Sequence, residues 1–519
     1  MEIDRRSLLK IASASATALA LVRPQVWQQG FAQEGATFAI GSLEEPGSLS
    51  ALVQLPHHFP ADAPQTLLFD SLTQLMPDGA VEPKLATGWD VSDDELTYTF
   101  TLNPDATFHD GTPVTADDVV FTFNAAKDPA TNSSDEGLET VENVTALDEH
   151  TVEVRVSRVT PAFLATAGAR GIVPKHVLEG TDIANDVFNR EPVGSGPYRF
   201  VSYTPGESIM FEAVEDHYRG AAAIPRVEFR VITDQNVLIT QIMSGELDYG
   251  LITPRNLEVL EGAGEVEIVE VETPRYFGLM PNFERPYWQD VKVRSAILGA
   301  IDRQGFVDQI LLGSGTVLNA NIAPASWAYT TEGVTEHPYD PEASAFALDE
   351  AGWVVGERGT REKDGTTLSF TVTLYSYDAT LQQAMLLAQQ NLAEIGVTME
   401  IEMVEPGVFS ERRDSGTYDA LARIWNPVYD PDQAFLFKTG NFYGYSNPDV
   451  DAMFDEAVST TDQEARRPIY EEIQRVLSED VPNLFLYSEN ELHALSNSYS
   501  GLVAHPVNVF WNFSSWEIN

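Results

Sequence analysis

Cysteine is absent from this sequence of 519 residues. Its absence excludes disulfides, thiol catalysis, cysteine-held iron–sulfur or zinc sites, and a lipid anchor attached through cysteine. Basic residues are few, 31 against 79 acidic ones, which gives a formal net charge of −48. A surface of this charge repels nucleic acids and anionic membranes, so we expect neither as a partner. The acidity is typical of a strongly hydrated surface suited to a salty environment, and recruitment of a cationic ligand is the alternative.

Long apolar runs are also missing beyond the N-terminus. No stretch there approaches the roughly 18 apolar residues of a membrane-spanning helix. Hydrophobic residues nevertheless make up 43% of the chain and aromatic residues 10%, which is enough for packed cores. At this length two or three lobes are expected rather than a single core. We therefore expect a soluble globular body with more than one lobe.

The N-terminus has the pattern of an export signal. Arg5 and Arg6 precede an apolar, alanine-rich segment, and a cationic head before such a segment is typical of a secretory signal. The paired arginines followed by Ser-Leu-Leu-Lys resemble the twin-arginine signal, whose route exports folded proteins. Small residues before Gln33 predict cleavage there and a signal over 1–32, and a retained anchor or an amphipathic first helix is the alternative.

The mature chain alternates between strand and helix patterns. Tyr98, Phe100 and Leu102 alternate with threonines, which predicts a strand with one buried face. A strand at 368–377, a helix at 379–396 and a further strand indicate a parallel crossover unit. No repeat of fixed period and no low-complexity linker separates the halves. Two mixed α/β lobes with several chain crossings are expected.

Motifs of chemistry are mostly missing. The sequence has no His-Glu-x-x-His, no phosphate-binding P-loop and no Gly-x-Ser-x-Gly elbow. The adjacent pair His57 and His58 is too small a donor set for a metal site by itself. The stretch "GSGPY" at 194–198 lies between strands, which favours a tight hairpin over a phosphate loop. No carboxylate pair stands out for glycoside hydrolysis. We expect no catalytic residue, no metal and no cofactor.

Several longer stretches occur in one order along the chain. They are "LATGWDVSDDELTYTFTLNPDATFHDGTPVTADDVVFTF", "PVGSGPYRFVSY", "QIMSGELDYG" and "VKVRSAILGAIDRQGFVDQILLGSG", with the shorter "ALDEAGW" and "DPDQAFLF". Together they resemble the extracytoplasmic solute-binding proteins of family 5, which serve ABC importers of dipeptides, oligopeptides and nickel chelates. The resemblance covers nearly all of residues 37–519.

The resemblance implies an α/β fold, namely the two-lobed periplasmic-binding-protein fold (type II-like, cluster C) with an extra subdomain inserted in lobe 1. Lobe 1 would span 33–272 with the subdomain at about 56–190, lobe 2 would span 273–487, and 488–519 would return to lobe 1. The ligand would be buried in the interlobe cleft, the lobes would close over it about a hinge, and the closed form would dock on a membrane permease. We expect a monomer without cofactor, located in the periplasm or otherwise outside the cytoplasmic membrane.

One loop carries the sharpest expectation about the ligand. The stretch "RIWNPVYDPDQAF" at 423–435 is made rigid by its prolines. In peptide-binding relatives the corresponding loop faces the cleft, its Trp packs the ligand, and an Asp three residues later pairs with the ligand's free amine. Trp425 matches, but Val428 stands where that Asp is expected, so either Asp430 takes its role or the ligand carries no ammonium there. The candidates in this loop are Trp425, Asn426, Tyr429 and Asp430.

Motif position adds cleft candidates from both lobes. Core packing is the alternative role for each of them, and an aromatic-lined pocket with few polar groups suits a small organic ligand. These candidates are Glu45 after the first strand, His58, Tyr276 and Asn282 at the start of lobe 2, Trp327, and Trp511 on the returning segment.

Three functions are therefore open. The leading one is an importer's receptor for a peptide or a similar organic solute. A nickel-chelate or haem-type receptor of the same family is the alternative, and it rests on His57 and His58. A secreted hydrolase with a carboxylate pair is the third.

Overall fold

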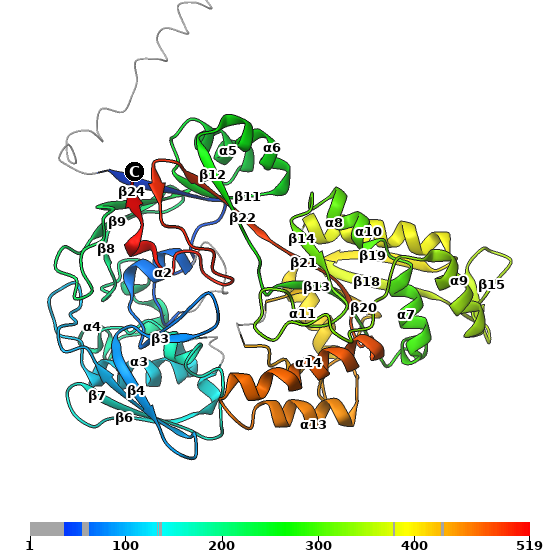
Figure 1. The fold of residues 1–519 in the computed structure, drawn as a ribbon, viewed down its shortest axis with the longest axis horizontal. Coiled ribbons are helices and arrows are strands. Elements are labelled where there is room, and N and C mark those ends of the chain that lie inside the picture. Colours follow the sequence, from blue (N-terminus) through cyan, green and yellow to red (C-terminus); the bar gives the residue numbers. More distant parts are fainter. Residues whose placement is uncertain (1–35, 54–61, 132, 134–136, 377–378, 427–429) are drawn as a thin grey trace, which may run out of the picture.

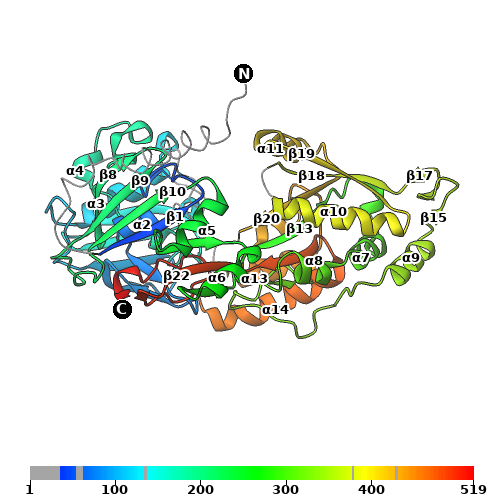
Figure 2. The same ribbon diagram turned by 90° about the horizontal axis from the view of Figure 1, so that it is seen from above.

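The computed structural model describes residues 36–53, 62–131, 133, 137–376, 379–426 and 430–519. These residues form two lobes that lie side by side, each built on a sheet with helices against it (Figures 1 and 2). In these ranges no helix is both long and apolar enough to cross a membrane. The two-lobed, mixed α/β architecture expected from the sequence is confirmed.

The sheet of lobe 1 has a parallel centre with antiparallel flanks. Strand β1 pairs in parallel with β10 and β11, and five of its six residues are buried because the sheet is covered on both faces. Within the described ranges the sheet has seven strands. Their order is β12 (Val266–Val271), β22 (Glu491–Ser496), β11 (Tyr249–Ile252), β1 (Thr37–Ser42), β10 (Arg226–Val231), β9 (Ser208–Ala213) and β8 (Tyr198–Thr204).

The chain segment that follows β1 and precedes β8 forms a second sheet in lobe 1, which is antiparallel. Tyr98, Phe100 and Leu102 of β5 are buried while the intervening threonines are not, which confirms the predicted alternation. The strands are β4 (Ala86–Val91), β5 (Thr97–Leu102), β7 (Thr151–Val156) and β6 (Val141–Ala146), beside the short pair β2 (Thr73–Leu75) and β3 (Val81–Pro83). The helices of lobe 1 are α2 (Asp62–Leu68), α3 (Ala116–Lys127), α4 (Lys175–Leu178), α5 (Gln235–Met243) and α6 (Leu257–Ala263).

The sheet of lobe 2 contains the predicted parallel crossover. Strands β18 and β19 pair in parallel and are joined by α10, which is followed by Gly396 at φ 78°. The strand order is β14 (Gly315–Val317), β21 (Leu484–Glu489), β13 (Tyr276–Pro281), β20 (Ala420–Trp425), β18 (Ser369–Tyr375) and β19 (Thr398–Val404). A small sheet of β15 (Val354–Val355), β16 (Arg361–Lys363) and β17 (Thr366–Thr367) projects from the outer end of this lobe (Figure 2).

Helices of lobe 2 begin at capping residues that the sequence displays. Asn447 accepts a hydrogen bond from the backbone N–H of Asp449 at 3.0 Å and precedes Pro448 at the first helical position. The Asp302 carboxylate caps α8 in the same way, accepting from the backbone N–H of Gly305 at 2.8 Å. The helices are α7 (Val291–Gly299), α8 (Arg303–Gln309), α9 (Pro341–Glu350), α10 (Ala379–Glu394), α11 (Pro406–Ser415), α12 (Ala434–Phe437), α13 (Pro448–Ala457) and α14 (Gln463–Asp480).

The chain crosses between the lobes twice. It leaves the first sheet after β12 and enters the second at β13, and it returns from β21 to β22 through Asn490. The last residues then pack on lobe 1, where Phe513 and Trp516 lie 5.2 and 5.7 Å from Phe38 of β1, between ring centroids. The short strands β23 (Tyr499–Ser500) and β24 (Glu517–Ile518) pair there.

The glycines of "GSGPY" have a different role from the predicted hairpin turn. They precede β8, whose hairpin with β9 turns later, at Pro205 and Gly206. A Cβ added at Gly194 would lie 1.8 Å from the carbonyl oxygen of Leu68, at the end of α2. The glycines are therefore required by a close approach of two backbones.

Candidate functional site

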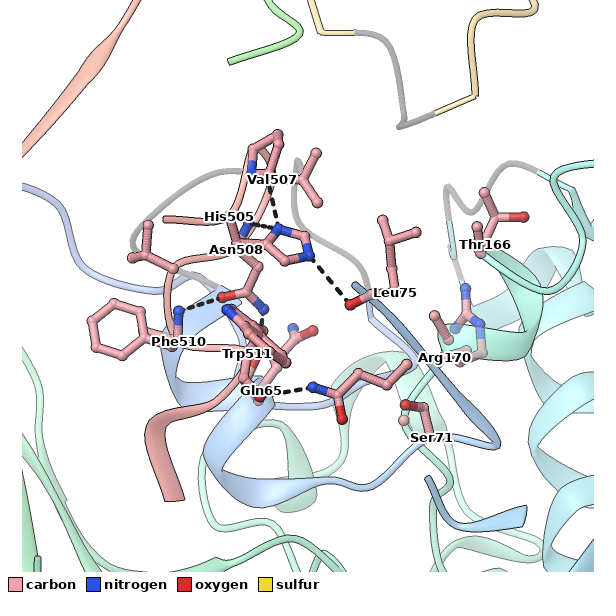
Figure 3. A pocket seen from close by; sticks show the side chains of 18 of the residues that line it. Gln65, Ser71, Leu75, Thr166, Arg170, His505, Val507, Asn508, Phe510 and Trp511 are labelled. Atoms are coloured by element: carbon pink, nitrogen blue, oxygen red, sulfur yellow. Dashed lines mark hydrogen bonds between the residues drawn. The ribbon is translucent and has the colours of Figure 1, made fainter. Parts of the chain in front are cut away.

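A cavity of about 270 Å³ lies where the two crossing segments join the lobes, and Figure 3 shows side chains that line it. Most of its wall comes from lobe 1, namely α2, the β2–β3 region and the returning C-terminal segment. The crossing strands add Thr273, Pro274 and Arg275, and lobe 2 adds Asn426. Amide and hydroxyl side chains dominate the polar part of this wall: Gln65, Ser71, Gln74, Thr166 and Asn508.

The returning segment is fixed to the pocket wall by His505. Its Nε2–H donates to the carbonyl oxygen of Leu75 at 3.2 Å, and its Nδ1 accepts from the backbone N–H of Val507 and of Asn508 (Figure 3). Burial lowers the pKa of His505 to about 4, so the ring is neutral and can make both kinds of bond. The His505 ring also lies 5.9 Å from the Trp511 ring, between centroids.

Trp511, predicted from the sequence as a cleft residue, does line the cavity. Its carbonyl oxygen accepts from Gln74 at 3.0 Å and its indole N–H donates to the carbonyl of Val503 at 3.3 Å. The ring is half-buried, so its remaining face is available to a ligand.

Two hydrogen-bonded links join the crossing strands at the floor of the pocket. Arg275 pairs with Glu491 at 2.7 Å, and the Thr273 hydroxyl donates to the carbonyl of Glu489 at 2.8 Å. Behind them His493 lies 2.6 Å, through Nδ1, from the hydroxyl of Tyr249. Burial raises the pKa of Tyr249 well above its usual value, so the phenol keeps its proton. The pocket floor and the hinge therefore share residues.

A buried charge cluster supports the lobe 1 wall. Asp70 is fully buried, with Lys84 at 3.1 Å, the Tyr218 hydroxyl at 2.6 Å and His217 Nε2 at 3.2 Å. Burial alone would raise the pKa of Asp70, but Lys84, His217 and Tyr218 together outweigh it and hold the pKa well below its ordinary value. Nothing in the local sequence indicates this cluster, because its members are separated by up to 148 residues.

Trp425, the chain neighbour of the cavity residue Asn426, is buried at 7% exposure and belongs to a cluster of lobe 2 side chains, here called the shelf: Arg423, Trp425 and Phe435. The guanidinium of Arg423 lies 3.7 Å from the Trp425 ring centroid, and Phe435 meets that ring edge-on at 5.9 Å. In the part of the chain that the structure describes, the Trp425 indole N–H has no hydrogen-bond partner. Phe435 is 64% exposed although it is a large aromatic residue. The sequence prediction included Trp425 but missed Arg423 and Phe435. Of these two, Phe435 lies in the motif "DPDQAFLF", which could have indicated it.

Asp430, the acid proposed from the sequence for a ligand's ammonium, is already paired. Both of its oxygens accept from Arg466 at 2.8 Å, and the Arg466 side chain is 3% exposed. A carboxylate held by such a bidentate pair is not available to a second cation. Asp432 lies beside it and accepts one hydrogen bond, from the N–H of Ala434 at 3.0 Å. Burial and the charge of Asp430 raise the pKa of Asp432, and Arg466 and Arg158 of lobe 1 offset part of this effect.

Two predicted candidates are placed inside lobe 2 instead of at the pocket. Tyr276 is fully buried and donates to Gln433 Oε1 at 2.8 Å. Asn282 is buried and its amide donates to the carbonyls of Gly416 and Tyr418. Both side chains are used to hold loops beside β13 and β20.

Two further candidates also make structural contacts. Trp327 packs edge-on against Tyr470 at 5.8 Å. The Glu45 carboxylate accepts from the Tyr203 hydroxyl at 2.6 Å and from the N–H of Gly206 at 2.8 Å, at the β8–β9 turn. Asn426 is exposed and lines the cavity. The predicted residues Arg5, Arg6, His57, His58, Val428 and Tyr429 lie outside the described residues.

These features define a class of protein: two α/β lobes, two segments that cross between them, and a pocket beside those segments that is lined by residues of both lobes. That arrangement is the architecture of a solute-binding receptor. The model of the bacterial extracellular solute-binding proteins, family 5, matches residues 80–447, and the chain belongs to that family.

Individual relatives are similar over almost their whole length. The oligopeptide-binding protein AppA of Bacillus subtilis is 28% identical over 509 residues, with 94% of this chain and 92% of that protein covered. The structure of AppA in complex with a nonapeptide superposes with a TM-score of 0.79 at 27% identity, covering 94% and 99% of the two chains. NikZ from Campylobacter jejuni in complex with Ni(L-His) also gives 0.79, at 28% identity and 93% and 100% coverage.

Proposed function

We propose that this protein is the extracytoplasmic receptor of an ABC importer, which captures a peptide or a similar small organic solute and delivers it unchanged to a membrane permease. The observation that carries the proposal is the pocket between the lobes, whose lobe 1 wall is rich in amide and hydroxyl groups and whose lining also includes Asn426 of lobe 2, the chain neighbour of the shelf residue Trp425. Amide and hydroxyl groups match the donors and acceptors of a peptide backbone. Membership of family 5 and the likeness to peptide-binding relatives support the same function.

The mechanism is a hinge equilibrium. A solute that touches the lobe 1 wall and the shelf together favours the closed arrangement by the difference between its affinities for the two states. The crossing strands line the pocket through Arg275 and Glu491, so a bound solute also contacts the segment that must bend. The closed form is the one that the permease would recognise.

For a ligand with a free amino group, Asp432 is the acid that we propose as its partner. Asp430 is occupied by Arg466, whereas Asp432 forms no ion pair within the described part of the chain and lies close enough to Arg158 of lobe 1 for that cation to lower its pKa. A ligand ammonium beside Asp432 would stabilise the ionised form of its carboxylate, which burial disfavours. Asp432→Asn should therefore weaken ligands that carry an amino group and leave acetylated forms unaffected.

The experiment that tests the proposed function identifies the cargo first. Native mass spectrometry of protein purified without refolding should show bound peptide, and calorimetry with that peptide gives its affinity. Trp425→Ala should weaken binding by about 2 kcal/mol, as loss of a buried aromatic anchor does. Phe346→Ala, at a residue 63% exposed on α9, is the matched control and should have no effect. Absence of cargo together with no thermal shift across peptide libraries would refute the proposal.

A metal-chelate receptor is the second candidate, favoured by the likeness to NikZ with Ni(L-His). Among the described residues no group of three or more His, Asp or Glu side chains could hold a metal ion. A chelate would therefore depend on His57 and His58. Replacing both by Ala should abolish binding of nickel in the presence of free histidine if this candidate is correct.

The remaining features of the proposal concern the whole chain. We propose a non-catalytic monomer, exported by the twin-arginine route with residues 1–32 as signal. We propose lobe 1 over 33–272, lobe 2 over 273–487 and the return over 488–519; the crossing after β12 supports the first of these bounds, whereas β21 continues to Glu489, two residues beyond the second. A Gln33 N-terminus in the exported protein, read by mass spectrometry, is the expected outcome.

A further inference from the structure

The two lobes touch at a second place, away from the hinge. Glu95 lies in the turn between β4 and β5 of lobe 1, and Thr460 and Thr461 lie between α13 and α14 of lobe 2. The Glu95 carboxylate accepts from the backbone N–H of Thr461 at 2.7 Å and from the Thr460 hydroxyl at 3.3 Å. In Figure 1, α13 and α14 reach across to the edge of lobe 1 beside β4 and β6, well away from β12 and β22, which lead to the hinge.

Glu95 has a backbone conformation that is unfavourable for a residue with a Cβ atom. Its φ is 54°, in the left-handed region where a Cβ is crowded and glycine is preferred. The turn is held by its own bonds, from the N–H of Glu95 to the carbonyl of Ser92 at 2.8 Å and from the N–H of Leu96 to Asp94 at 3.2 Å. Local turn chemistry therefore does not explain a glutamate here. Its contact with the other lobe does.

The position of the carboxylate on lobe 2 is electrostatically favourable. Thr460 and Thr461 directly precede Asp462, the capping residue of α14, a helix of 18 residues. The N–H of Thr461 lies one residue before the cap, outside the helix, and its hydrogen bond to the ionised Glu95 carboxylate is stronger than a neutral one. Both bonds are partly buried, so solvent screens them less than bonds on an open surface.

We propose that Glu95 is a clasp, a positioning residue that holds the lobes at the separation seen here and keeps the shelf opposite the lobe 1 pocket. Among the described residues, and apart from the Arg275–Glu491 pair at the crossing segments, the side-chain hydrogen bond from Arg255 to Gln383 at 2.9 Å also joins the lobes, but it is exposed and contributes little. The inference about lobe separation holds whichever solute binds. Only its consequence for affinity rests on the proposed function.

The test measures the distance between the lobes without any ligand. Because the chain has no cysteine, Leu147→Cys on lobe 1 and Leu386→Cys on α10 give two unique spin labels, at side chains 54% and 50% exposed. Double electron–electron resonance then reports the distribution of separations. We expect the distribution to broaden and to shift to longer distances in Glu95→Gln and Glu95→Gly.

Two features of the design separate a clasp from ordinary stabilisation. Glycine suits the left-handed φ of this turn, so Glu95→Gly should not lower the thermal unfolding temperature while it releases the lobes. Asp93→Asn removes the same charge from the same turn, and within the described residues the Asp93 side chain has no hydrogen bond or ion pair. This control should leave the distances unchanged. Thr460→Val should give a smaller shift in the same direction as Glu95→Gln.

The outcomes are distinct. Distance distributions of Glu95→Gln and Glu95→Gly that match the wild type would overturn the clasp, and so would an equal shift in Asp93→Asn. With the co-purified peptide as probe, Glu95→Gly should raise the dissociation constant about tenfold, because a smaller fraction of molecules holds the shelf in place. If the wild type binds no peptide but the Glu95 variants still show the shift in distance, the proposed function is contradicted and the clasp stands.

Discussion

Asp70 offers the sharpest test of the packing that supports the pocket wall. Its side chain is 1% exposed, and Lys84, at 10%, is its ion-pair partner. Asp70→Asn removes the negative charge but keeps the shape, which leaves the Lys84 ammonium buried without its counter-charge. Removing one partner of a buried ion pair costs about 3–5 kcal/mol. Because Asn retains an oxygen for the Tyr218 hydroxyl, we expect about 3 kcal/mol.

The assay is urea unfolding followed by tryptophan fluorescence at pH 7. Asp105→Asn, at an exposed aspartate, is the control and should stay within about 0.5 kcal/mol of the wild type. Adding Lys84→Met to Asp70→Asn should recover part of the loss, since no unpaired charge remains. The folded-state pKa of Asp70 is lowered, so its contribution is fully present above pH 4 and is lost as the pH falls further. An Asp70→Asn variant as stable as Asp105→Asn would refute this reasoning.

Two further predictions concern acid stability and backbone packing. Burial lowers the pKa of His505 and of His109 to about 4. Between pH 6.5 and 4 the unfolded chain therefore binds protons that the folded chain does not. The contribution of His505 alone should lower the free energy of unfolding by roughly 3 kcal/mol as the pH drops over this range. A melting temperature independent of pH over this range would contradict it. Gly194→Ala should destabilise the fold by several kcal/mol because the added Cβ would collide with the Leu68 carbonyl oxygen. Gly88→Ala is the control and should not destabilise it, since no atom lies within 4 Å of the added Cβ. Equal melting temperatures of the two variants would show that the backbone adjusts.

Much of the fold was predictable because its signals are local. The alternation in β5 and the crossover through α10 depend on patterns within each segment, and the structure confirms both. The interpretation of "GSGPY" was wrong for the opposite reason. Its glycines are required by contact with α2, a helix more than a hundred residues earlier in the chain.

The candidate site was predictable only in part. The sequence predicted Trp511 and Asn426 at the pocket, and both line it. It could not show that Arg466, 36 residues later, occupies Asp430, or that Tyr276 and Asn282 are turned into lobe 2. Residue type and motif position indicate which loop approaches the cleft, but the partner of each side chain depends on elements distant in the sequence.

By itself, the sequence determined the class: the periodic strands and helices indicate mixed α/β lobes, and the order of the motifs resembles that of the family 5 solute-binding proteins. Only the tertiary structure decided which side chains are free for a ligand, because burial and pairing arise where distant segments meet. The Asp430–Arg466 pair, the buried Asp70 cluster and the contact of Glu95 with Thr461 are of this kind. Each joins residues that no local pattern connects.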